Sequence, residues 1–385
     1  MSWVTKKVSD FADVVTGGTP STSNSDYWTN GTIPWLPSGA CQNCVINSAD
    51  TFITELGLRE SAAKMMPPDT VVIALTGATT GKVGLLAIDA CANQSVTGIL
   101  PNDTYSSMYL FHYLQSIRDK VIGDSYGGAQ KHISQGYVKS MEILFPPLDI
   151  QRRIAAVLDK AQSLIAARRE QIAVLDKLSK DLFIDMFGDM NTNPMKWEMK
   201  NLLAVASIDT HMTSDFDKYA DCYHIGIENI EKNSGAIINP TKVKDSGLIS
   251  GKYPFDSRHI IYSKIRPNLN KVALPDFVGL CSADSYPILP KNDVCDRIYL
   301  AFVMRSEFFL SYILDFSGRS NIPKVNKQQL SSFNLPTPPI ELQREFAKKV
   351  TAINRQKSRL VESLTELETL YKSLTQRAFA GELFT

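Results

Sequence analysis

One helix-start motif occurs twice in this chain, and the repeat limits the possible folds more than any other feature. The stretch Pro146-Pro147-Leu148-Asp149-Ile150-Gln151-Arg152 returns 192 positions later, about half of the 385 residues away, as Pro338-Pro339-Ile340-Glu341-Leu342-Gln343-Arg344. Other landmarks recur in the same order at offsets of 189 to 194: Trp3 with Trp197, Gly81-Lys82-Val83 with Asn270-Lys271-Val272, and Tyr109-Leu110 with Tyr299-Leu300. Solenoid units are only about 20 to 50 residues long. Each copy is therefore expected to be a whole domain followed by a helix.

A long amphipathic helix is predicted after each motif. Prolines are tolerated at a helix start, and the acidic residue that follows suits the positive end of the helix. Apolar residues then step by threes and fours over several heptads, which predicts a narrow stripe that packs against another helix. The simplest partner is the other copy, and packing on the adjoining globular domain alone is the alternative. Gly188 and Gly381 are predicted to end the helices.

Each stripe is interrupted by one basic residue. The first stripe consists of Ile154, Leu158, Ala161, Ile165, Arg168, Ile172, Leu175 and Leu182. The second consists of Phe346, Val350, Ile353, Lys357, Leu360, Leu364, Leu367, Tyr371, Leu374 and Ala378. Polar residues in such a seam fix register rather than add stability, so Arg168 and Lys357 are predicted to set the alignment of the two helices.

The segments before the helices are predicted to mix α and β structure. Residues 70–75 and 83–88 in the first copy, and 259–263 and 272–274 in the second, have the composition of strands flanking a polar loop. Helical stretches rich in aromatic residues follow at 105–120 and 296–316, and their aromatic side chains are expected in the core.

The predicted fold class is α+β, with two similar domains separated by two long helices that form an antiparallel coiled coil with pseudo-two-fold symmetry. The expected boundaries are domain 1 at 1–148, helix 1 at 149–190, domain 2 at 191–339 and helix 2 at 340–385.

Composition is that of an ordinary globular protein, with 44% hydrophobic and 21% charged residues. No apolar run reaches the roughly 20 residues of a membrane helix, and the N-terminus lacks a signal-peptide core, so a cytoplasmic location is expected. Net charge is −3 for residues 1–148, 0 for 149–190, +2 for 191–339 and +2 for 340–385. None of these segments has the positive field of a protein that holds DNA by charge alone.

The sequence offers little evidence of catalysis. Cys41 and Cys44 have the spacing of a zinc or redox pair, but nothing completes a tetrahedral set, so ordinary thiols are the preferred interpretation. Residues 77–83 resemble a phosphate loop with one residue too few between the glycines, which favours a hairpin loop. The histidines have no metal-ligand spacing. No catalytic residue, metal site or cofactor is predicted.

Polar loops at equivalent places in the two copies are the candidate DNA contacts. Arginine pairs with guanine edges, asparagine with adenine, and lysine with phosphates. The candidates in the first copy are Thr76, Thr79, Thr80, Lys82, Gln130, Lys131 and His132. Those in the second are Lys264, Arg266, Asn268, Asn270, Lys271, Arg319, Asn321 and Lys324. Near-matching frameworks that carry different polar residues are what two readers of different DNA sequences require.

The chain resembles the specificity (S) subunits of Type I restriction-modification systems. The resemblance rests on the two proline-glutamine motifs, on Thr16-Gly17-Gly18-Thr19-Pro20 with Ile33-Pro34-Trp35-Leu36, and on residues 223–230 and 264–272. It implies two target recognition domains, each binding one half of a bipartite, asymmetric site in double-stranded DNA. It also implies two docked methyltransferase (M) subunits and restriction/translocase (R) subunits, with no active site in the S subunit itself.

The predicted helix length agrees with a split DNA site. A helix of about 37 residues spans roughly 55 Å, which exceeds one DNA turn of about 35 Å, so an unread spacer is expected between the half-sites. Two alternatives remain open: a coiled-coil scaffold whose domains bind protein, and a stand-alone modification enzyme, which needs a cofactor site that the sequence does not show.

Overall fold

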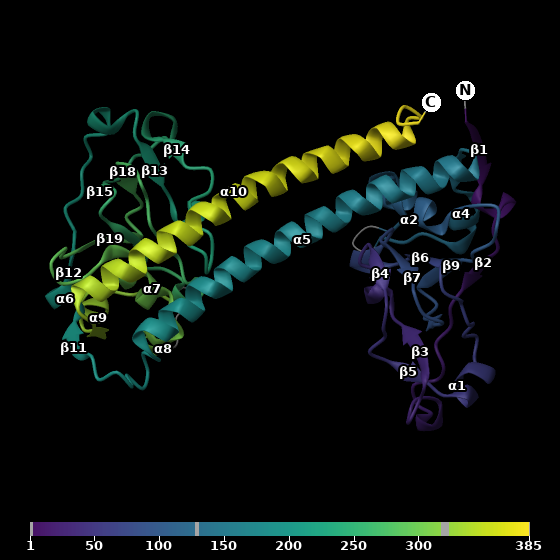
Figure 1. Ribbon diagram of the computed structural model, residues 1–385, viewed down its shortest axis with the longest axis horizontal. Coiled ribbons are helices and arrows are strands. Elements are labelled where there is room, and N and C mark those ends of the chain that lie inside the picture. The colour runs from purple at the N-terminus through teal and green to yellow at the C-terminus, as the bar shows by residue number, and fades with distance from the viewer. Residues whose placement is uncertain (1–2, 128–130, 317–322, 385) are drawn as a thin grey trace. The chain divides into compact units, whose positions relative to one another are not determined.

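The computed structural model describes residues 3–127, 131–316 and 323–384 (Figure 1). The chain forms two compact units. Unit 1 comprises Met1–Arg169 with Glu362–Thr385, and unit 2 comprises Glu170–Val361. Each unit therefore contains one globular domain, part of the helix that follows it in the chain, and part of the other long helix.

The described part of unit 1 contains three sheets. Strand β1 (Val4–Lys7) pairs antiparallel with β10 (Glu142–Phe145), which joins the start of the domain to its end. The five-stranded sheet has the order β2-β9-β6-β7-β4, with bounds Val14–Thr16, Val96–Ile99, Val71–Ala74, Val83–Leu86 and Cys44–Ile46. The smaller sheet has the order β5-β3-β8, with bounds Phe52–Ile53, Ile33–Leu36 and Cys91–Ala92. In Figure 1, β3 and β5 lie at the end of the domain away from the long helices.

The central strands of unit 1 are fully buried because both faces of the sheet are covered. All residues of β6, β7 and β9 are buried. Tyr109, Phe111 and Leu114 of α2 lie in the same core, as the sequence predicts. The helices are α1 (Glu55–Arg59), α2 (Ser107–Ser116), α3 (Arg118–Asp124) and α4 (Gln135–Ser140). Short 3-10 turns are η1 (Val8–Asp10), η2 (Ser25–Tyr27), η3 (Ser38–Ala40) and η4 (Gly77–Thr79).

Unit 2 repeats this plan. Strand β11 (Glu198–Asn201) pairs antiparallel with β20 (Asn334–Thr337). One sheet has the order β12-β19-β16-β17, with bounds Ala206–Ile208, Ser285–Pro290, Ile260–Ser263 and Val272–Ala273. The other has the order β14-β13-β18-β15, with bounds Thr241–Lys242, Tyr223–Ile225, Gly279–Cys281 and Tyr253–Phe255. The helices are α6 (Leu202–Val205), α7 (Arg297–Arg305), α8 (Glu307–Leu314) and α9 (Lys327–Ser331). The 3-10 turns are η5 (Asp217–Tyr219), η6 (Ile227–Asn229), η7 (Val243–Asp245) and η8 (Pro267–Leu269).

The internal repeat predicted from the sequence is confirmed for most of the strands, although β4 of unit 1 and β15 of unit 2 have no counterpart among the described residues. The order β2-β9-β6-β7 matches β12-β19-β16-β17, and the parallel pair β3–β8 matches β13–β18. Even single hydrogen bonds recur. The Tyr109 hydroxyl donates to the Leu144 carbonyl at 2.7 Å, and the Tyr299 hydroxyl donates to the Pro336 carbonyl at 2.7 Å.

The repeated glutamine explains why the helix-start motif occurs twice. Gln151 is fully buried; its Oε1 accepts from the backbone N–H of Ser106, the N-cap of α2, and its Nε2 donates to the Pro146 carbonyl. Gln343 does the same in unit 2, accepting from the N-cap residue of α7 and donating to the first proline of its own motif. Each motif thus fastens the start of a long helix to a domain helix through polar groups that burial would otherwise leave unpaired.

The long helices are α5 (Leu148–Phe187) and α10 (Ile340–Phe379), 40 residues each. The predicted stripe positions that the sequence singles out are all buried or half-buried. Gly188 and Gly381 follow the helix ends with φ of 78° and 79°, the left-handed conformation of a glycine stop.

The two helices pack together and run antiparallel within each unit. In unit 1, Gln162 donates to the Tyr371 hydroxyl at 2.7 Å and Arg169 pairs with Glu368 at 2.6 Å. In unit 2, Lys357 forms an ion pair with Asp176. Arg168 has no such pair among the described residues.

The ends of the helices also pack on the domains, so the alternative interpretation of the stripes is partly correct. Ile154, Leu158 and Ala378 lie in the core of unit 1, whereas Phe187 and Phe346 lie in the core of unit 2. No helix in the described part of the chain is long and apolar enough to span a bilayer.

Candidate nucleic-acid interface

The candidate contacts lie on one hairpin loop in each unit and on a neighbouring segment. Hairpin loop 1, residues 75–82, joins β6 to β7, and hairpin loop 2, residues 264–271, joins β16 to β17. The interpretation of residues 77–83 as part of a hairpin, rather than a phosphate loop, is therefore confirmed. Cover segment 1, residues 131–133, and cover segment 2, residues 323–325, pair with these loops.

The same backbone hydrogen bonds hold loop and cover segment in both units. In unit 1, the Gly77 N–H donates to the Lys131 carbonyl (3.1 Å) and the Ile133 N–H donates to the Leu75 carbonyl (2.9 Å). In unit 2, the Arg266 N–H donates to the Pro323 carbonyl at 2.8 Å. The Val325 N–H donates to the Lys264 carbonyl (2.7 Å), which matches the bond from Ile133 to Leu75 in unit 1. The structure thus brings together polar loops that lie more than 40 residues apart in the chain.

Both loops use the same turn, but with different residues at its strained positions. Gly77 and Gly81 have φ of 75° and 73°, and their equivalents Arg266 and Asn270, each 189 residues later, have φ of 50° and 47°. This left-handed conformation costs a residue with a Cβ roughly 1–2 kcal/mol, whereas glycine adopts it freely. Asparagine visits it more readily than most residues, but arginine does not. Loop 2 therefore holds an arginine where the backbone favours glycine.

Hairpin loop 1 presents only part of its predicted set. Thr80 is 2% exposed and its hydroxyl is directed at the Gly77 and Lys131 carbonyls, so this residue holds the loop and offers no group to a ligand. Lys82 donates to Gln42 Oε1 at 2.7 Å. The Thr79 hydroxyl donates to the Thr76 carbonyl at 3.3 Å, and both residues remain half-exposed.

Cover segment 1 adds an exposed basic residue and an aromatic one. Lys131 is exposed, and the half-buried ring of His132 lies edge-on to Tyr126 with ring centroids 4.9 Å apart. Tyr126 is 59% exposed and was not predicted; its aromatic ring beside a polar loop was the available signal. Gln130 lies outside the described residues.

Hairpin loop 2 divides into residues that face outward and residues that fasten the loop. Arg266 and Asn268 are exposed and have no side-chain partner among the described residues. Asn270 is 8% exposed and its Nδ2 donates to the Arg305 carbonyl at 2.9 Å. The Lys271 ammonium donates to the Ile227 carbonyl at 2.6 Å. Asn270 and Lys271 therefore stabilise the loop in this structure rather than reach out of it.

Lys264 and Lys324 are also engaged within the protein. The Lys264 ammonium lies 4.8 Å from the ring centre of Tyr286 and 5.9 Å from that of Tyr253. Burial, and next the charge of Lys324, lower the pKa of Lys264. Lys324 is exposed and pairs with Asp284 at 3.2 Å. Arg319 and Asn321 lie outside the described residues.

Arg305 stabilises the end of hairpin loop 2, and the sequence did not predict this role. Its Nε and Nη2 both donate to the Val272 carbonyl, at 3.0 and 2.6 Å, at the end of the loop. Burial lowers the pKa of Arg305 to about 10. No sequence pattern marks this role, because Arg305 lies at the end of a stretch that is rich in aromatic residues and predicted to lie in the core.

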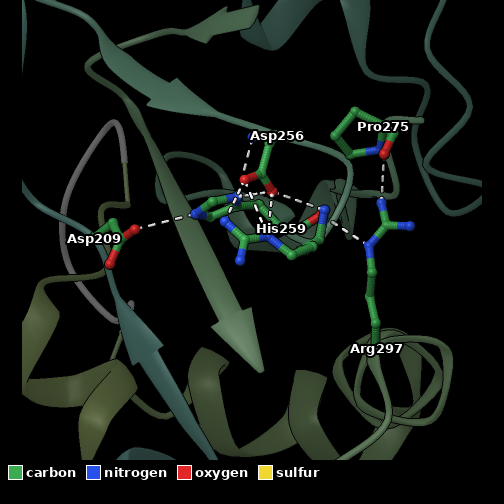
Figure 2. Close-up of polar contacts among 6 residues, drawn as sticks. Asp209, Asp256, His259, Pro275 and Arg297 are labelled. Carbon is green, nitrogen blue, oxygen red and sulfur yellow. Dashed lines mark hydrogen bonds and ion pairs between the residues drawn. The ribbon is translucent and has the colours of Figure 1, made fainter. Parts of the chain in front are cut away.

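A polar cluster around His259 connects strand ends in unit 2 (Figure 2). The Nε2 atom of His259 lies 3.1 Å from Asp209 Oδ2, just after β12, and Nδ1 lies 3.0 Å from Asp256 Oδ1, just after β15. Arg297, at the start of α7, donates to the carbonyls of His259 and Pro275 at 3.0 and 2.6 Å. These contacts join the two four-stranded sheets of unit 2, so the cluster is a structural support of the domain.

The cysteines do not form a reactive site in the described residues. All six are free, and burial raises the pKa of Cys41 to about 12 and that of Cys91 to about 11. Such thiols stay protonated at neutral pH and are poor nucleophiles. Within residues 3–127, 131–316 and 323–384, no group of three or more metal-ligating side chains comes together.

Comparison with known proteins identifies the family. The sequence profile of the Type I restriction modification DNA specificity domain matches residues 1–176 and 194–369, so the chain belongs to this family as a specificity subunit with two recognition domains. It is 27% identical to the Type I restriction enzyme EcoDI specificity subunit of Escherichia coli, over 71% of this chain and 70% of that protein. It is 22% identical to the MjaIX specificity subunit of Methanocaldococcus jannaschii, over 99% of this chain and 93% of that protein.

Solved structures support the fold. The S subunit of a Type I restriction-modification system from M. genitalium has a TM-score of 0.66 at 12% identity and covers 98% of this chain and 96% of its own. A chain from a study of complex assembly and conformational transition in a Type I system has a TM-score of 0.53 at 16% identity, over 99% of this chain and 98% of its own. The predicted α+β fold with two domains and paired long helices is thereby confirmed.

Proposed function

We propose that this subunit reads a bipartite, asymmetric site in double-stranded DNA, one half-site per domain, and has no catalytic activity of its own. The observation that carries the proposal is the pair of hairpin loops. Their backbone hydrogen bonds and left-handed positions are equivalent, while their exposed side chains differ. Two loops with the same backbone and different polar side chains offer different hydrogen-bonding groups to the edges of the bases, which is what the recognition of two unlike half-sites requires.

We assign DNA reading to residues 1–148 and 191–339, and the connection between half-sites to the helices at 149–190 and 340–385. The preferred contacts in the first domain are Thr76, Thr79, Lys131 and His132, with Tyr126 added. In the second domain they are Arg266 and Asn268. We leave out side chains that are buried and lysines whose ammonium already bonds within the protein, because those contacts must break before the side chain can bind DNA.

We expect the phosphate contacts to come largely from partner subunits. The chain has a formal net charge of only +1, and two lysines of the second domain, Lys271 and Lys324, already have partners within the protein. Affinity for duplex DNA that relies on charge rises with the number of phosphates neutralised. The isolated chain should therefore bind duplex DNA weakly at physiological salt. Tight binding under that condition would contradict this part of the proposal.

The partners we propose are two methyltransferase subunits and the restriction/translocase subunits of a cytoplasmic Type I complex. On α5 within unit 2, Val174 and Leu178 are 57% and 46% exposed and lie one helical turn apart on the same face. An apolar face of this kind on a helix supports docking of another protein. The side chains that would transfer methyl groups or cut DNA then belong to those subunits.

Genome-wide methylation mapping tests the proposal directly. Cells that carry this chain with its methyltransferase subunit should methylate a two-part motif with a fixed spacer, and the motif should disappear when the chain is deleted. An unchanged methylome, with the methyltransferase shown to be active, would favour a coiled-coil scaffold that binds protein instead of DNA.

A further inference from the structure

We propose that Arg266 is the specificity-determining residue of the half-site read by the second domain, and that this half-site contains a guanine which the Arg266 guanidinium reads. The inference rests on the proposed function. It adds the base that is read, the residue that reads it and the conformational cost of keeping that residue. Three observations on hairpin loop 2 carry it.

The first observation is the backbone at Arg266. Its φ of 50° is the left-handed conformation, and the equivalent residue in hairpin loop 1 is Gly77, with φ of 75°. The same turn in the same chain is therefore built with a glycine, without conformational cost. Keeping an arginine there opposes stability, and strained positions of this kind gather where a side chain must be held for a ligand.

The second observation is that the loop is held without the Arg266 side chain. The backbone N–H of Arg266 bonds to the Pro323 carbonyl, and Asn270 and Lys271 bond to the carbonyls of Arg305 and Ile227. Arg305 secures the Val272 carbonyl at the end of the loop. The guanidinium of Arg266 is exposed, and no partner of it lies among the described residues. The loop does not need this side chain for its own structure.

The third observation is the contrast with the other basic residues of this region. Lys264 is enclosed by two tyrosine rings, Lys271 donates to a backbone carbonyl, and Lys324 pairs with Asp284. Arg266 alone among these four is exposed and unpaired within the described residues. A planar guanidinium with a fixed fork of donors matches the O6 and N7 acceptors of guanine in the major groove. We infer that the strained backbone directs this fork at a base rather than at a phosphate.

Replacement of Arg266 by glycine separates reading from folding. Arg266→Gly introduces the residue that hairpin loop 1 already uses, so the melting temperature of the purified chain should not fall. In cells with the methyltransferase subunit, methylation should lose discrimination at one G·C position of one half-site, by on the order of 10- to 100-fold. The other half-site and the spacer should stay unchanged. Arg266→Lys, which keeps the charge but not the fork, should relax the same position.

Lys196→Gly is the matched control. Lys196 is also an exposed basic residue with positive φ, 56°, but it lies in the segment between α5 and β11, outside the hairpin loops. The substitution removes the same charge and the same kind of backbone strain, and the methylation motif should be that of the parent chain.

Several outcomes would overturn the assignment. A parent motif retained in full by Arg266→Gly would show that the residue reads no base. A uniform loss of methylation at all sites, restored by Arg266→Lys, would assign a phosphate contact. A lower melting temperature for Arg266→Gly would make the residue structural. Failure of the proposed function itself looks different, because the parent chain would then direct no two-part motif at all.

Discussion

The strongest stability prediction concerns His112, a histidine in the core of unit 1. It is 1% exposed, and neither ring nitrogen has a hydrogen-bond partner among the described residues. Burial lowers the pKa of His112 to about 4. The equivalent position in unit 2, 190 residues later, is Phe302, which shows that this site in the fold accepts an apolar ring. Replacing His112 with phenylalanine should therefore remove a titratable group without loss of the fold.

The sign of the pH dependence follows from the lowered pKa. An unfolded histidine titrates near pH 6.5, so below that pH the unfolded chain takes up a proton that the folded chain, with a pKa of about 4, does not. The free energy of unfolding then falls as the pH falls from about 6.5 to 4, by up to about 1.4 kcal/mol per pH unit. At pH 4.5 the accumulated loss is about 2.5 kcal/mol. Above pH 7 the group contributes no such term.

Denaturant unfolding of the parent and His112→Phe chains at pH 7.5 and 4.5 measures this difference. Tryptophan fluorescence is a suitable signal, because Trp3, Trp28 and Trp35 lie in unit 1 and only Trp197 lies in unit 2. The stability advantage of His112→Phe should be larger at pH 4.5 by about 2.5 kcal/mol. His211→Phe, the same substitution at an exposed position, is the control. An advantage of equal size at both pH values would refute the reasoning.

Three further predictions concern the frame of the molecule. Gln151→Ala should destabilise unit 1, and Gln343→Ala unit 2, each by about 1–3 kcal/mol, because a buried backbone N–H loses its acceptor; domain-resolved hydrogen exchange should place each loss in its own unit. Hydrogen bonds from Arg258 hold the pKa of Asp256 below the ordinary pKa of an aspartate, so the ionised carboxylate stabilises unit 2 above pH 4 and this stabilisation is lost as the pH falls below that ordinary pKa. Asp256→Asn should remove this part of the pH dependence of unfolding, measured by denaturation at a series of pH values. An unchanged pH dependence would argue against it. The Lys357–Asp176 pair is largely exposed on the Asp176 side, so a double-mutant cycle with Lys357→Met and Asp176→Asn should give a coupling of about 0–1 kcal/mol in thermal unfolding.

The strands and the long helices were predicted well from the sequence, because the repeat shows each pattern twice. Strands β6, β7, β16 and β17 follow from apolar runs around polar loops, and the helices follow from stripes that continue for 40 residues. The glutamines of the motifs were recognised as equivalent, but their contact with the N-cap of a domain helix was not predictable. That contact depends on tertiary packing between segments about 45 residues apart.

The loops were harder to interpret, because a polar residue in a loop has no periodicity that says where it points. Thr80 and Asn270 have the same composition signal as Thr79 and Asn268, yet they face the interior and fasten the loop. The backbone conformation at Arg266 had an available signal. The offset of 189 that aligns Gly81 with Asn270 also aligns Gly77 with Arg266, and an arginine aligned with a glycine in a turn indicates a strained position.

The backbone contacts that hold the hairpin loops are separate from the exposed side chains of the loops, which explains how two domains of the same fold can recognise different DNA sequences. Backbone hydrogen bonds join each hairpin loop to its cover segment, and in unit 1 the buried Thr80 hydroxyl adds a bond to the Lys131 carbonyl. None of these contacts depends on an exposed side chain, so they survive changes of the exposed residues. The two domains could therefore diverge in what they present without losing stability, as long as the left-handed positions stayed compatible. At Arg266 that condition is not met, since the side chain and the backbone preference conflict. The backbone of hairpin loop 2 is held by contacts that do not involve the Arg266 side chain, so the conflict contributes nothing to the fold and is explained by what the side chain binds. This is why replacement of Arg266 by glycine should separate stability from DNA reading.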